Sequence, residues 1–463
     1  MASKKQRQML PAQVLVLGFA VIILMGAMIL MLPVSSAAGQ MSDPLTALFT
    51  ATTSVCVTGL VVVPTYSHWS FFGQCVILLL IQMGGLGFMT FATMAVVALG
   101  RKISLKDRLL IQESLNQNSM SGLIRLTQKV VLGTVLVEGC GAVLLCFRFI
   151  PEFGFAKGLY YGIFHAVSAF CNAGLDVIGP DSMMPYVSDP YVNLVLILLI
   201  VLGGLGYIVW LEVLGAIRRC RAGKHKLRYS FWVSVWKECT LYSRLVLVMT
   251  GLLIVSGALL FWLMEIRNPR TLGGLSFPGS VQAALFQSVT TRTAGFASID
   301  QGAMMDNSKI LSSILMFIGG SSGSTAGGIK TVTAAVLILT IWSYIRGRSD
   351  TEVFGRRISA SAVRRAVSLF ACAFLGILTI SMLISGIDEM PFLDVLFEVA
   401  SAAGTTGLST GITAALSPVS RVLVILLMFI GRLGPLTIMM ALTIRQKESR
   451  ANVRKPEEEV LIG

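Results

Sequence analysis

Four short stretches of the chain end in the same kind of turn. Each has a Phe early, continues through apolar or small residues, and closes on a Gly followed by Leu or Phe. They cover residues 48–60, 163–175, 285–296 and 396–408. Their closing glycines, Gly59, Gly174, Gly295 and Gly407, are 115, 121 and 112 residues apart. None is long enough to cross a bilayer, which takes about 20 apolar residues. We therefore expect each stretch to enter the membrane and turn back.

Turns of this kind could bind a cation through their backbone. Irregular backbone at membrane depth is tolerated only where protein buries it or where it lines water. Four equivalent turns would therefore face one another around an axis, and their free carbonyl groups could replace the hydration shell of an ion. The candidate filter residues are Val57, Thr58 and Gly59, Asn172, Ala173 and Gly174, Thr293, Ala294 and Gly295, and Thr405, Thr406 and Gly407. Their side chains differ widely, which favours coordination by carbonyl oxygens. The alternative is four ordinary helix breaks in the core of a transporter.

Apolar helices flank each turn and must position it. In the first unit we expect helices over about 12–32 and 71–98, and in the second over 127–150 and 191–216. The motifs MGGLGFMT at 83–90 and LGGLGYIV at 202–209 support the repeat, as does LMFIG at 315–319 and 427–431. The predicted fold is an all-α membrane protein with four tandem helix–re-entrant loop–helix units in pseudo-fourfold arrangement.

The predicted boundaries follow from this repeat. They are an N-terminus at 1–10, pore unit 1 at 11–110, pore unit 2 at 111–217, a basic loop at 218–243, pore unit 3 at 244–345, a loop at 346–365, pore unit 4 at 366–444 and a tail at 445–463.

The charge of the chain fits a membrane protein. Of its 463 residues 55% are hydrophobic and 13% charged, which excludes an ordinary soluble domain. The net charge is +14. If both termini are cytoplasmic, 28 of the 37 Lys and Arg fall on the inner side and six on the outer side. This bias explains the basic charge without a nucleic-acid partner and predicts a multi-pass plasma-membrane protein. The sequence has no acid–base pair or metal-ligand cluster that would indicate an enzyme.

Three further features lie in the third and fourth units. Residues 319–331, GGSSGSTAGGIKT, interrupt an apolar helix. They are similar to a phosphate-binding loop, but Ile329 separates Gly328 from Lys330, and no strand precedes them. Arg432 lies within an apolar helix, where a charge is costly unless it has a role or reaches the headgroups. Arg292 adjoins the third turn, and we expect its side chain to point away from the axis, toward a carboxylate such as Asp300 or Glu398.

These motifs together resemble the Trk/Ktr/HKT superfamily of potassium transporters, and most of all the membrane subunit of the Ktr potassium-uptake system. The resemblance covers essentially the whole chain. It is carried by TTSVCVTGL (52–60), HAVSAFCNAGL (165–175), TTRTAGFASID (290–300), FEVASAAGTTGLSTG (397–411), the Gly-rich 319–330 and FIGRLGPLT (429–437).

The resemblance implies K⁺ uptake through a channel-like pore, with four glycines indicating potassium selectivity. It implies a gate below the filter, formed by Gly319, Gly320, Ser321, Ser322, Gly323, Ser324, Thr325, Ala326, Gly327, Gly328, Lys330 and Arg432. It also implies a homodimer, Na⁺ as an activator, and a cytoplasmic regulatory ring (KtrA-like). ATP or ADP would then bind to that ring and not to this chain. The alternative is a sodium- or proton-coupled alternating-access carrier or symporter. Such carriers usually have inverted repeats and membrane carboxylates, whereas these repeats are parallel and the apolar helices contain few acids, Glu138 and Glu212 being the exceptions.

Overall fold

The computed structural model describes residues 11–87, 89–90, 93–94, 123–221, 231–434, 437–438 and 441. The predicted N-terminus, the centres of the first two inner loops and the C-terminal tail lie outside the described residues. Within them the named regular elements are helices apart from one hairpin, β1 (Glu352–Val353) with β2 (Arg356–Arg357). The predicted all-α class is confirmed.

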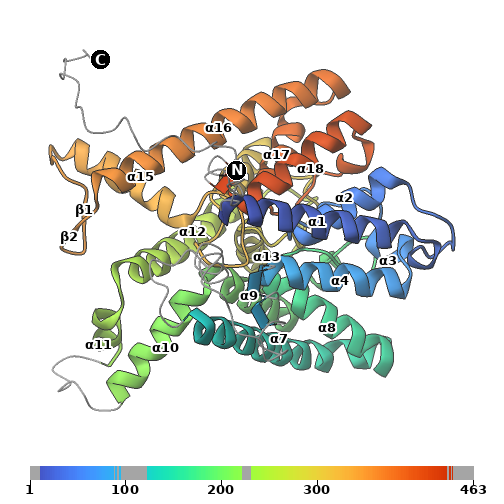
Figure 1. The fold of residues 1–463 in the computed structure, drawn as a ribbon, viewed down its shortest axis with the longest axis horizontal. Helices are drawn as coiled ribbons and strands as arrows, with labels where there is room; N and C mark the ends of the chain where they lie inside the picture. Colours follow the sequence, from blue (N-terminus) through green and yellow to red (C-terminus); the bar gives the residue numbers. More distant parts are fainter. Residues whose placement is uncertain are drawn as a thin grey trace, which may run out of the picture.

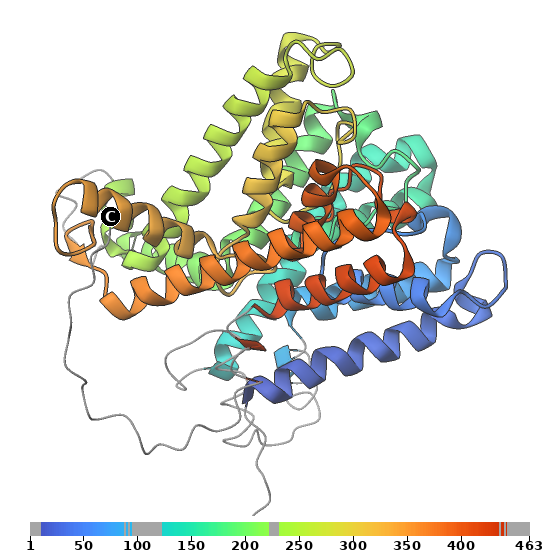
Figure 2. The same ribbon diagram turned by 90° about the horizontal axis from the view of Figure 1, so that it is seen from above.

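The helices follow the same order in each unit: a long helix, a short one that ends at the turn, and a further helix (Figures 1 and 2). The first unit contains α1 (Pro11–Met31), η1 (Pro33–Ser35), α2 (Pro44–Val55), α3 (Thr65–His68) and α4 (Phe71–Leu86). The second contains α7 (Leu123–Phe153), α8 (Phe155–Cys171), η2 (Met184–Tyr186), α9 (Pro190–Leu205) and α10 (Tyr207–Arg221), and α11 (Phe231–Glu238) follows it. The third contains α12 (Leu241–Glu265), α13 (Phe277–Thr290), α14 (Asp306–Phe317) and α15 (Thr331–Ile345). The fourth contains α16 (Ala360–Asp388), α17 (Phe392–Gly404), η3 (Thr413–Ala415) and α18 (Pro418–Leu433).

The first helix of each unit, α1, α7, α12 and α16, is long and apolar enough to cross a membrane. The short helices α2, α8, α13 and α17 are called the pore helices below. Two of them start at a side-chain cap, because Asp43 accepts a hydrogen bond from the backbone N–H of Thr46 at 2.9 Å and Ser276 accepts one from Gly279. These caps fix where α2 and α13 begin.

The second membrane helix of the units is interrupted, and here the prediction of continuous helices over 71–98 and 191–216 is wrong. A glycine with positive φ follows α4, α9 and α18: Gly87 (φ +80°), Gly206 (φ +93°) and Gly434 (φ +82°). Each helix ends at this glycine, because a positive φ of this kind is easily adopted only by glycine. After Gly206 the chain bends by 97° into α10. In the third unit the break is the long loop 319–330, as the sequence predicts.

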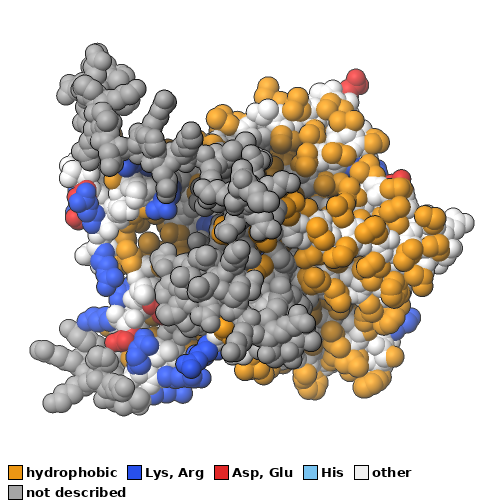
Figure 3. Space-filling model, viewed as in Figure 1, with side chains coloured by type: hydrophobic (Ala, Val, Ile, Leu, Met, Phe, Trp, Pro, Cys, Tyr) orange, Lys and Arg blue, Asp and Glu red, His pale blue; other side chains and the backbone are white. Residues whose placement is uncertain are grey.

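The molecular surface divides along the long axis of the molecule. Hydrophobic side chains cover the part built from the long helices, whereas Lys and Arg gather toward the end formed by α10, α11 and the β1–β2 hairpin (Figure 3). Exposed apolar side chains on the long helices, such as Leu132 and Met382, belong to the hydrophobic part. A broad apolar band of this kind is what a lipid-facing protein requires.

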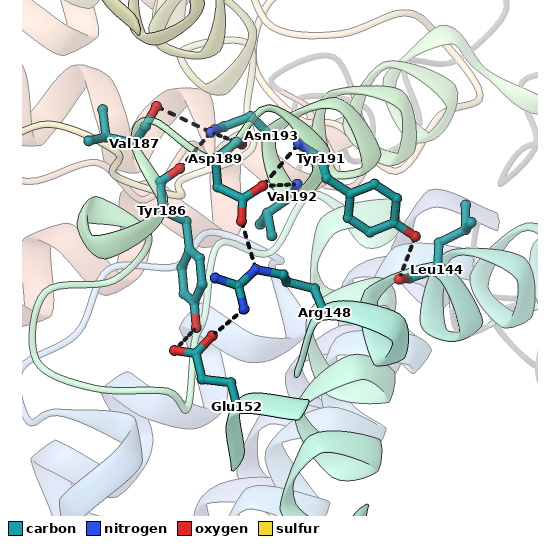
Figure 4. A network of polar contacts seen from close by, with 9 residues as sticks. All are labelled: Leu144, Arg148, Glu152, Tyr186, Val187, Asp189, Tyr191, Val192 and Asn193. Carbon is teal, nitrogen blue, oxygen red and sulfur yellow. Dashed lines mark hydrogen bonds and ion pairs between the residues drawn. The ribbon is translucent and has the colours of Figure 1, made fainter. Parts of the chain in front are cut away.

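A polar network fastens α7 to the start of α9 (Figure 4). Arg148 donates from Nε to Asp189 at 2.8 Å and from Nη1 to Glu152 at 3.0 Å. Asp189 in turn accepts from the first amides of α9, and the hydroxyl of Tyr186 donates to Glu152 at 3.0 Å. The network therefore fixes one end of the second unit.

Candidate functional site

The four glycine turns form a closed ring. A Cβ atom added to any of the four glycines would lie closer than 3.0 Å to a carbonyl oxygen of another unit. The contacts are Gly59 with Ala173, Gly174 with Ala294, Gly295 with Thr406, and Gly407 with Thr58. Each turn thus contacts the next unit along the chain, and the fourth contacts the first. Because no side chain fits in these contacts, the ring requires glycine at all four positions.

The backbone of the four turns follows one pattern despite different side chains. The four glycines have φ between +63° and +97°. The residue two positions before each glycine is also left-handed: Val57 (φ 55°), Asn172 (φ 59°), Thr293 (φ 71°) and Thr405 (φ 53°). Positive φ is unfavourable for such residues, particularly β-branched ones. Strain repeated at equivalent positions is typical of functional backbone.

A hydroxyl group from each pore helix holds its own turn. In the first and fourth units the amide of the glycine donates to this hydroxyl, Gly59 to Thr53 at 2.9 Å and Gly407 to Ser401 at 3.0 Å. In the other two units the hydroxyl donates to the carbonyl after the glycine, Ser168 to Leu175 and Thr290 to Phe296, both at 2.7 Å. These buried bonds fix the direction in which the carbonyl groups of the turns point.

All of the predicted filter residues belong to this ring. Eight of them make the contacts named above, and the side-chain amide of Asn172 lies 3.3 Å from the hydroxyl of Thr293. Val57 and Thr405 complete the first and fourth turns and are buried. We call the end of the ring formed by the last residues of the pore helices its inner end.

The loop 319–330, called the gate loop below, is bonded to the second unit at this inner end. The amides of Ser321 and Thr325 donate to the carbonyls of Gly204 at 3.1 Å and Gly203 at 3.3 Å. The hydroxyl of Thr325 donates to the carbonyl of Phe170 at 3.2 Å, near the end of pore helix α8. The gate loop therefore contacts both the pore helix and the broken helix of the second unit.

The opposite side of the gate loop is held by two tyrosines. The amide of Tyr207, the first residue of α10, donates to the carbonyl of Gly323 at 3.0 Å, and the hydroxyl of Tyr242 on α12 donates to that of Ser322 at 2.7 Å. These contacts link the loop to α10 and α12 at the basic end of the molecule.

The glycines of the gate loop allow it to lie against the fourth unit. A Cβ atom on Gly327 would overlap the side chain of Thr405, and one on Gly328 would lie 3.4 Å from the α-carbon of Gly404. Gly319 and Gly320 are packed as tightly, against Gly327 and Ala326 of the loop itself. The loop thus approaches the ring as closely as backbone allows.

Polar side chains within the gate loop stabilise its own fold. Ser324 donates to the carbonyl of Ser321 at 2.6 Å, and the hydroxyl of Ser321 lies 3.1 Å from that of Thr331. The Nζ atom of Lys330 donates to the carbonyl of Ala326 at 2.8 Å. In this structure Lys330 therefore bonds within the gate loop and stabilises its conformation.

Arg432 joins the gate loop to the first unit. It lies in the last turn of α18, and its guanidinium group donates to the carbonyls of Thr325, Gly84 and Gly85. Since Thr325 also bonds to Phe170, this arginine and this threonine connect all four units at the inner end of the ring. The planar guanidinium suits this role because its five N–H groups can serve several carbonyls at once.

The expected partner of Arg292 is not found. Glu398 accepts from Thr413, and Asp300 accepts from the amide of Gly302. Within the part of the chain that the structure describes, Nε of Arg292 has no hydrogen-bond partner, and its side chain borders a small cavity with Ile254 and Gly204. Neither expected carboxylate bonds to it.

Several contributors to the site were not predicted from the sequence. The bracing hydroxyls, Thr53, Ser168, Thr290 and Ser401, could have been found because each lies five or six residues before its glycine. The contacts of Phe170, Tyr207 and Tyr242 with the gate loop have no comparable local signal. They depend on how distant units pack.

Comparisons with known proteins agree with this architecture. The chain matches the profile of the TrkH family, described as cation transport protein, over residues 3–454. It is 40% identical to the Ktr system potassium uptake protein B of Bacillus subtilis, covering 98% of this chain and 97% of that one. It is 39% identical to the potassium/sodium uptake protein NtpJ of Enterococcus hirae, covering 100% and 99%.

A solved structure shows the same fold. The potassium transporter TrkH from Vibrio parahaemolyticus superposes with a TM-score of 0.70 at 17% identity, covering 95% of this chain and 86% of that one. The resemblance inferred from the motifs is confirmed, and the family is one of transporters and not of enzymes. The chain belongs to the TrkH family of cation transport proteins.

Proposed function

We propose that this protein takes up K⁺ across the plasma membrane through the ring of four glycine turns. The main support for this proposal is the closed cycle of contacts that joins Gly59, Gly174, Gly295 and Gly407 to the next unit in turn. A ring of backbone carbonyls can replace the water around K⁺, and the pore helices direct their negative ends toward the same place. Relatives of similar length named for potassium uptake support K⁺ as the ion.

The gate loop and Arg432 close this path at the inner end of the ring. Support comes from the bonds of the Arg432 side chain to the carbonyls of Thr325 and Gly84, which join a cationic group and the gate loop to the first unit. A fixed positive charge on the path repels K⁺, and the loop adds a steric barrier. Opening then requires the bonds to Thr325 to break.

The basic end of the molecule faces the cytoplasm in this proposal, with both termini on that side. The positive-inside bias supports this orientation. The protein works as a homodimer with a cytoplasmic nucleotide-binding ring docked on its inner face, and Na⁺ acts as an activator. The name "Ktr system" of one relative supports a partner subunit, and the name "potassium/sodium uptake" of another supports Na⁺ as an ion that acts on the protein.

Growth rescue tests the proposal. The protein and a regulatory ring would be expressed in a bacterium that lacks potassium uptake, at low K⁺, with and without Na⁺. We expect rescue by the wild type and none by Gly295→Ser, because a side chain there meets the carbonyl of Thr406. Gly251→Ser is the matched control, since nothing lies within 4 Å of a Cβ atom at that position of α12. Failure of a well-expressed wild type would refute K⁺ uptake, and full rescue by Gly295→Ser would refute the filter.

A further inference from the structure

A buried carboxylate lies behind the ring, in the middle of α7. Glu138 is 7% exposed. Its Oε2 accepts a hydrogen bond from the side-chain amide of Gln82 at 3.0 Å, and its Oε1 lies 3.6 Å from the thiol of Cys171. The thiol is also 3.6 Å from Oε1 of Gln82. Three side chains from α4, α7 and α8 thus form one polar cluster in a membrane-spanning region.

Both partners of Glu138 are next to the ion path. Cys171 is the last residue of pore helix α8 and directly precedes Asn172, the first filter residue of the second turn. Gln82 lies in the last turns of α4, two residues before Gly84, whose carbonyl accepts from Arg432. A Cβ atom on Gly85 would lie 2.5 Å from the sulfur of Cys171. The end of α4 therefore lies between Arg432 on one side and the Glu138 cluster on the other.

A carboxylate in this place is costly without compensation. In a membrane interior, ionisable side chains are rare and usually serve a function. Within the described residues no ion pair includes Glu138, and its bonds to Gln82 and Cys171 are what offset its burial. An apolar residue of similar size would fill the same space without this cost, so packing alone does not explain a glutamate.

We propose that Glu138 is a positioning residue for both the filter and the gate. Through Cys171 it fixes the start of the second filter turn, and through Gln82 it fixes the end of α4 on which Arg432 closes. One side chain thereby holds the second turn of the ring and the end of α4 in fixed positions relative to each other. This inference rests on the proposed function, because it assumes that the ring conducts and that Arg432 closes it.

The two arms of the cluster predict different kinetic effects. Cys171→Ala removes the bond between the second turn and Glu138. We therefore expect weaker discrimination of K⁺ from Na⁺, with an unchanged maximal rate of uptake. Gln82→Leu removes the bond between Glu138 and the end of α4, where Arg432 binds. We therefore expect a higher maximal rate of uptake, with unchanged discrimination between K⁺ and Na⁺. Glu138→Leu should change both the discrimination and the maximal rate, on the order of tenfold, as expected for losing two buried hydrogen bonds. Glu138→Gln keeps one acceptor and one bond, and should lie between Glu138→Leu and the wild type.

Uptake of Rb⁺ into cells, normalised to the amount of protein at the surface, measures the maximal rate. Inhibition of this uptake by Na⁺ measures the discrimination. Thr127→Val is the control, since this buried residue lies three turns earlier on the same face of α7 and its hydroxyl donates to the carbonyl of Leu123 within the same helix. It should behave as the wild type. Unchanged discrimination in Cys171→Ala together with an unchanged maximal rate in Gln82→Leu would overturn the proposal, as would equal effects of Thr127→Val and Glu138→Leu.

A double-mutant cycle separates this inference from the proposed gate. If Arg432→Gln alone leaves uptake unchanged, the gate proposal fails. If Arg432→Gln acts but its effect simply adds to that of Gln82→Leu, the gate stands and the role of Glu138 fails. We expect a non-additive pair, because both residues hold the same end of α4.

Discussion

The hydroxyl of Thr325 in the gate loop donates to the carbonyl oxygen of Phe170 at the end of pore helix α8, at 3.2 Å. The carbonyl of the same Thr325 accepts from Arg432. One residue of the third unit thus contacts the pore helix of the second unit and the arginine of the fourth. In the proposed mechanism, a displacement of the gate loop can therefore reach the ring through this single residue.

Thr325→Val tests this contact. Valine keeps the shape of threonine and the backbone carbonyl but cannot donate to Phe170. The loss of one buried hydrogen bond, worth about 1 kcal/mol, should raise the population of the displaced loop about fivefold. Rb⁺ flux into proteoliposomes should rise accordingly. Thr333→Val, on α15 just beyond the loop, is the control and should keep wild-type flux. A Thr325→Val flux equal to that of the control would show that the bond does not restrain the loop.

Arg432→Ala should raise the maximal rate of K⁺ uptake without reducing the amount of protein in the membrane. The substitution frees three carbonyls and removes the positive charge at the inner end of the ring. Arg432→Lys keeps the charge, but a single ammonium group cannot reproduce the planar set of donors, so an intermediate rate is expected. Deletion of residues 320–328 should also raise flux, and Arg432→Ala should add little to it. Wild-type kinetics in Arg432→Ala would remove this residue from the gate.

Thr53→Val should weaken the selectivity for K⁺ over Na⁺. The hydroxyl of Thr53 accepts from the amide of Gly59, so valine leaves a buried donor unpaired and frees the first turn. Ser401→Ala should have the same effect on the fourth turn. Ser54→Ala is a matched control, because Ser54 donates only to Thr50 within its own pore helix. Inhibition of Rb⁺ uptake by Na⁺ measures the change. Equal inhibition in Thr53→Val and Ser54→Ala would contradict the role of these hydroxyls.

The repeat and the four glycine turns of the ring were predictable because their signals are local. A turn in which a carbonyl of the next unit excludes a side chain needs glycine, and Gly59, Gly174, Gly295 and Gly407 recur with matched neighbours. The gate loop could be located for the same reason, since its glycines cluster in one segment. These features are visible without knowing which units touch.

The helix breaks and long-range contacts were harder to predict. Gly87 and Gly206 lie in strongly apolar runs, where hydropathy favours a continuous helix, although the shared GGLG motif marks both breaks. The bond between Gln82 and Glu138 joins residues 56 positions apart, which no periodicity indicates. The prediction of a carboxylate partner for Arg292 was wrong, since Glu398 accepts from Thr413, Asp300 accepts from the amide of Gly302, and neither bonds to the arginine.

Asp189 should make the stability of the protein depend on pH in the acid range. Partial burial raises the pKa of this carboxyl, but the hydrogen bonds from Arg148 and from the amides of Val192 and Tyr191 outweigh it, so the pKa lies below its usual value (Figure 4). A carboxyl with a lowered pKa in the folded state contributes stability above its unfolded pKa, about 3.9, and this contribution is lost as the pH falls through the folded value. The melting temperature of the purified protein should therefore drop below about pH 4.

Asp189→Asn should remove that part of the pH dependence, because asparagine does not titrate, and should lower the melting temperature at neutral pH by weakening the bond to Arg148. Asp181→Asn is the control, since Asp181 is exposed in the loop before α9, and it should keep the wild-type profile. Melting curves between about pH 3 and pH 7 distinguish these outcomes, as this range spans the unfolded pKa. If Asp189→Asn melts with the same pH profile as the wild type, the acid sensitivity arises elsewhere, and the network of α7 and α9 does not depend on this charge.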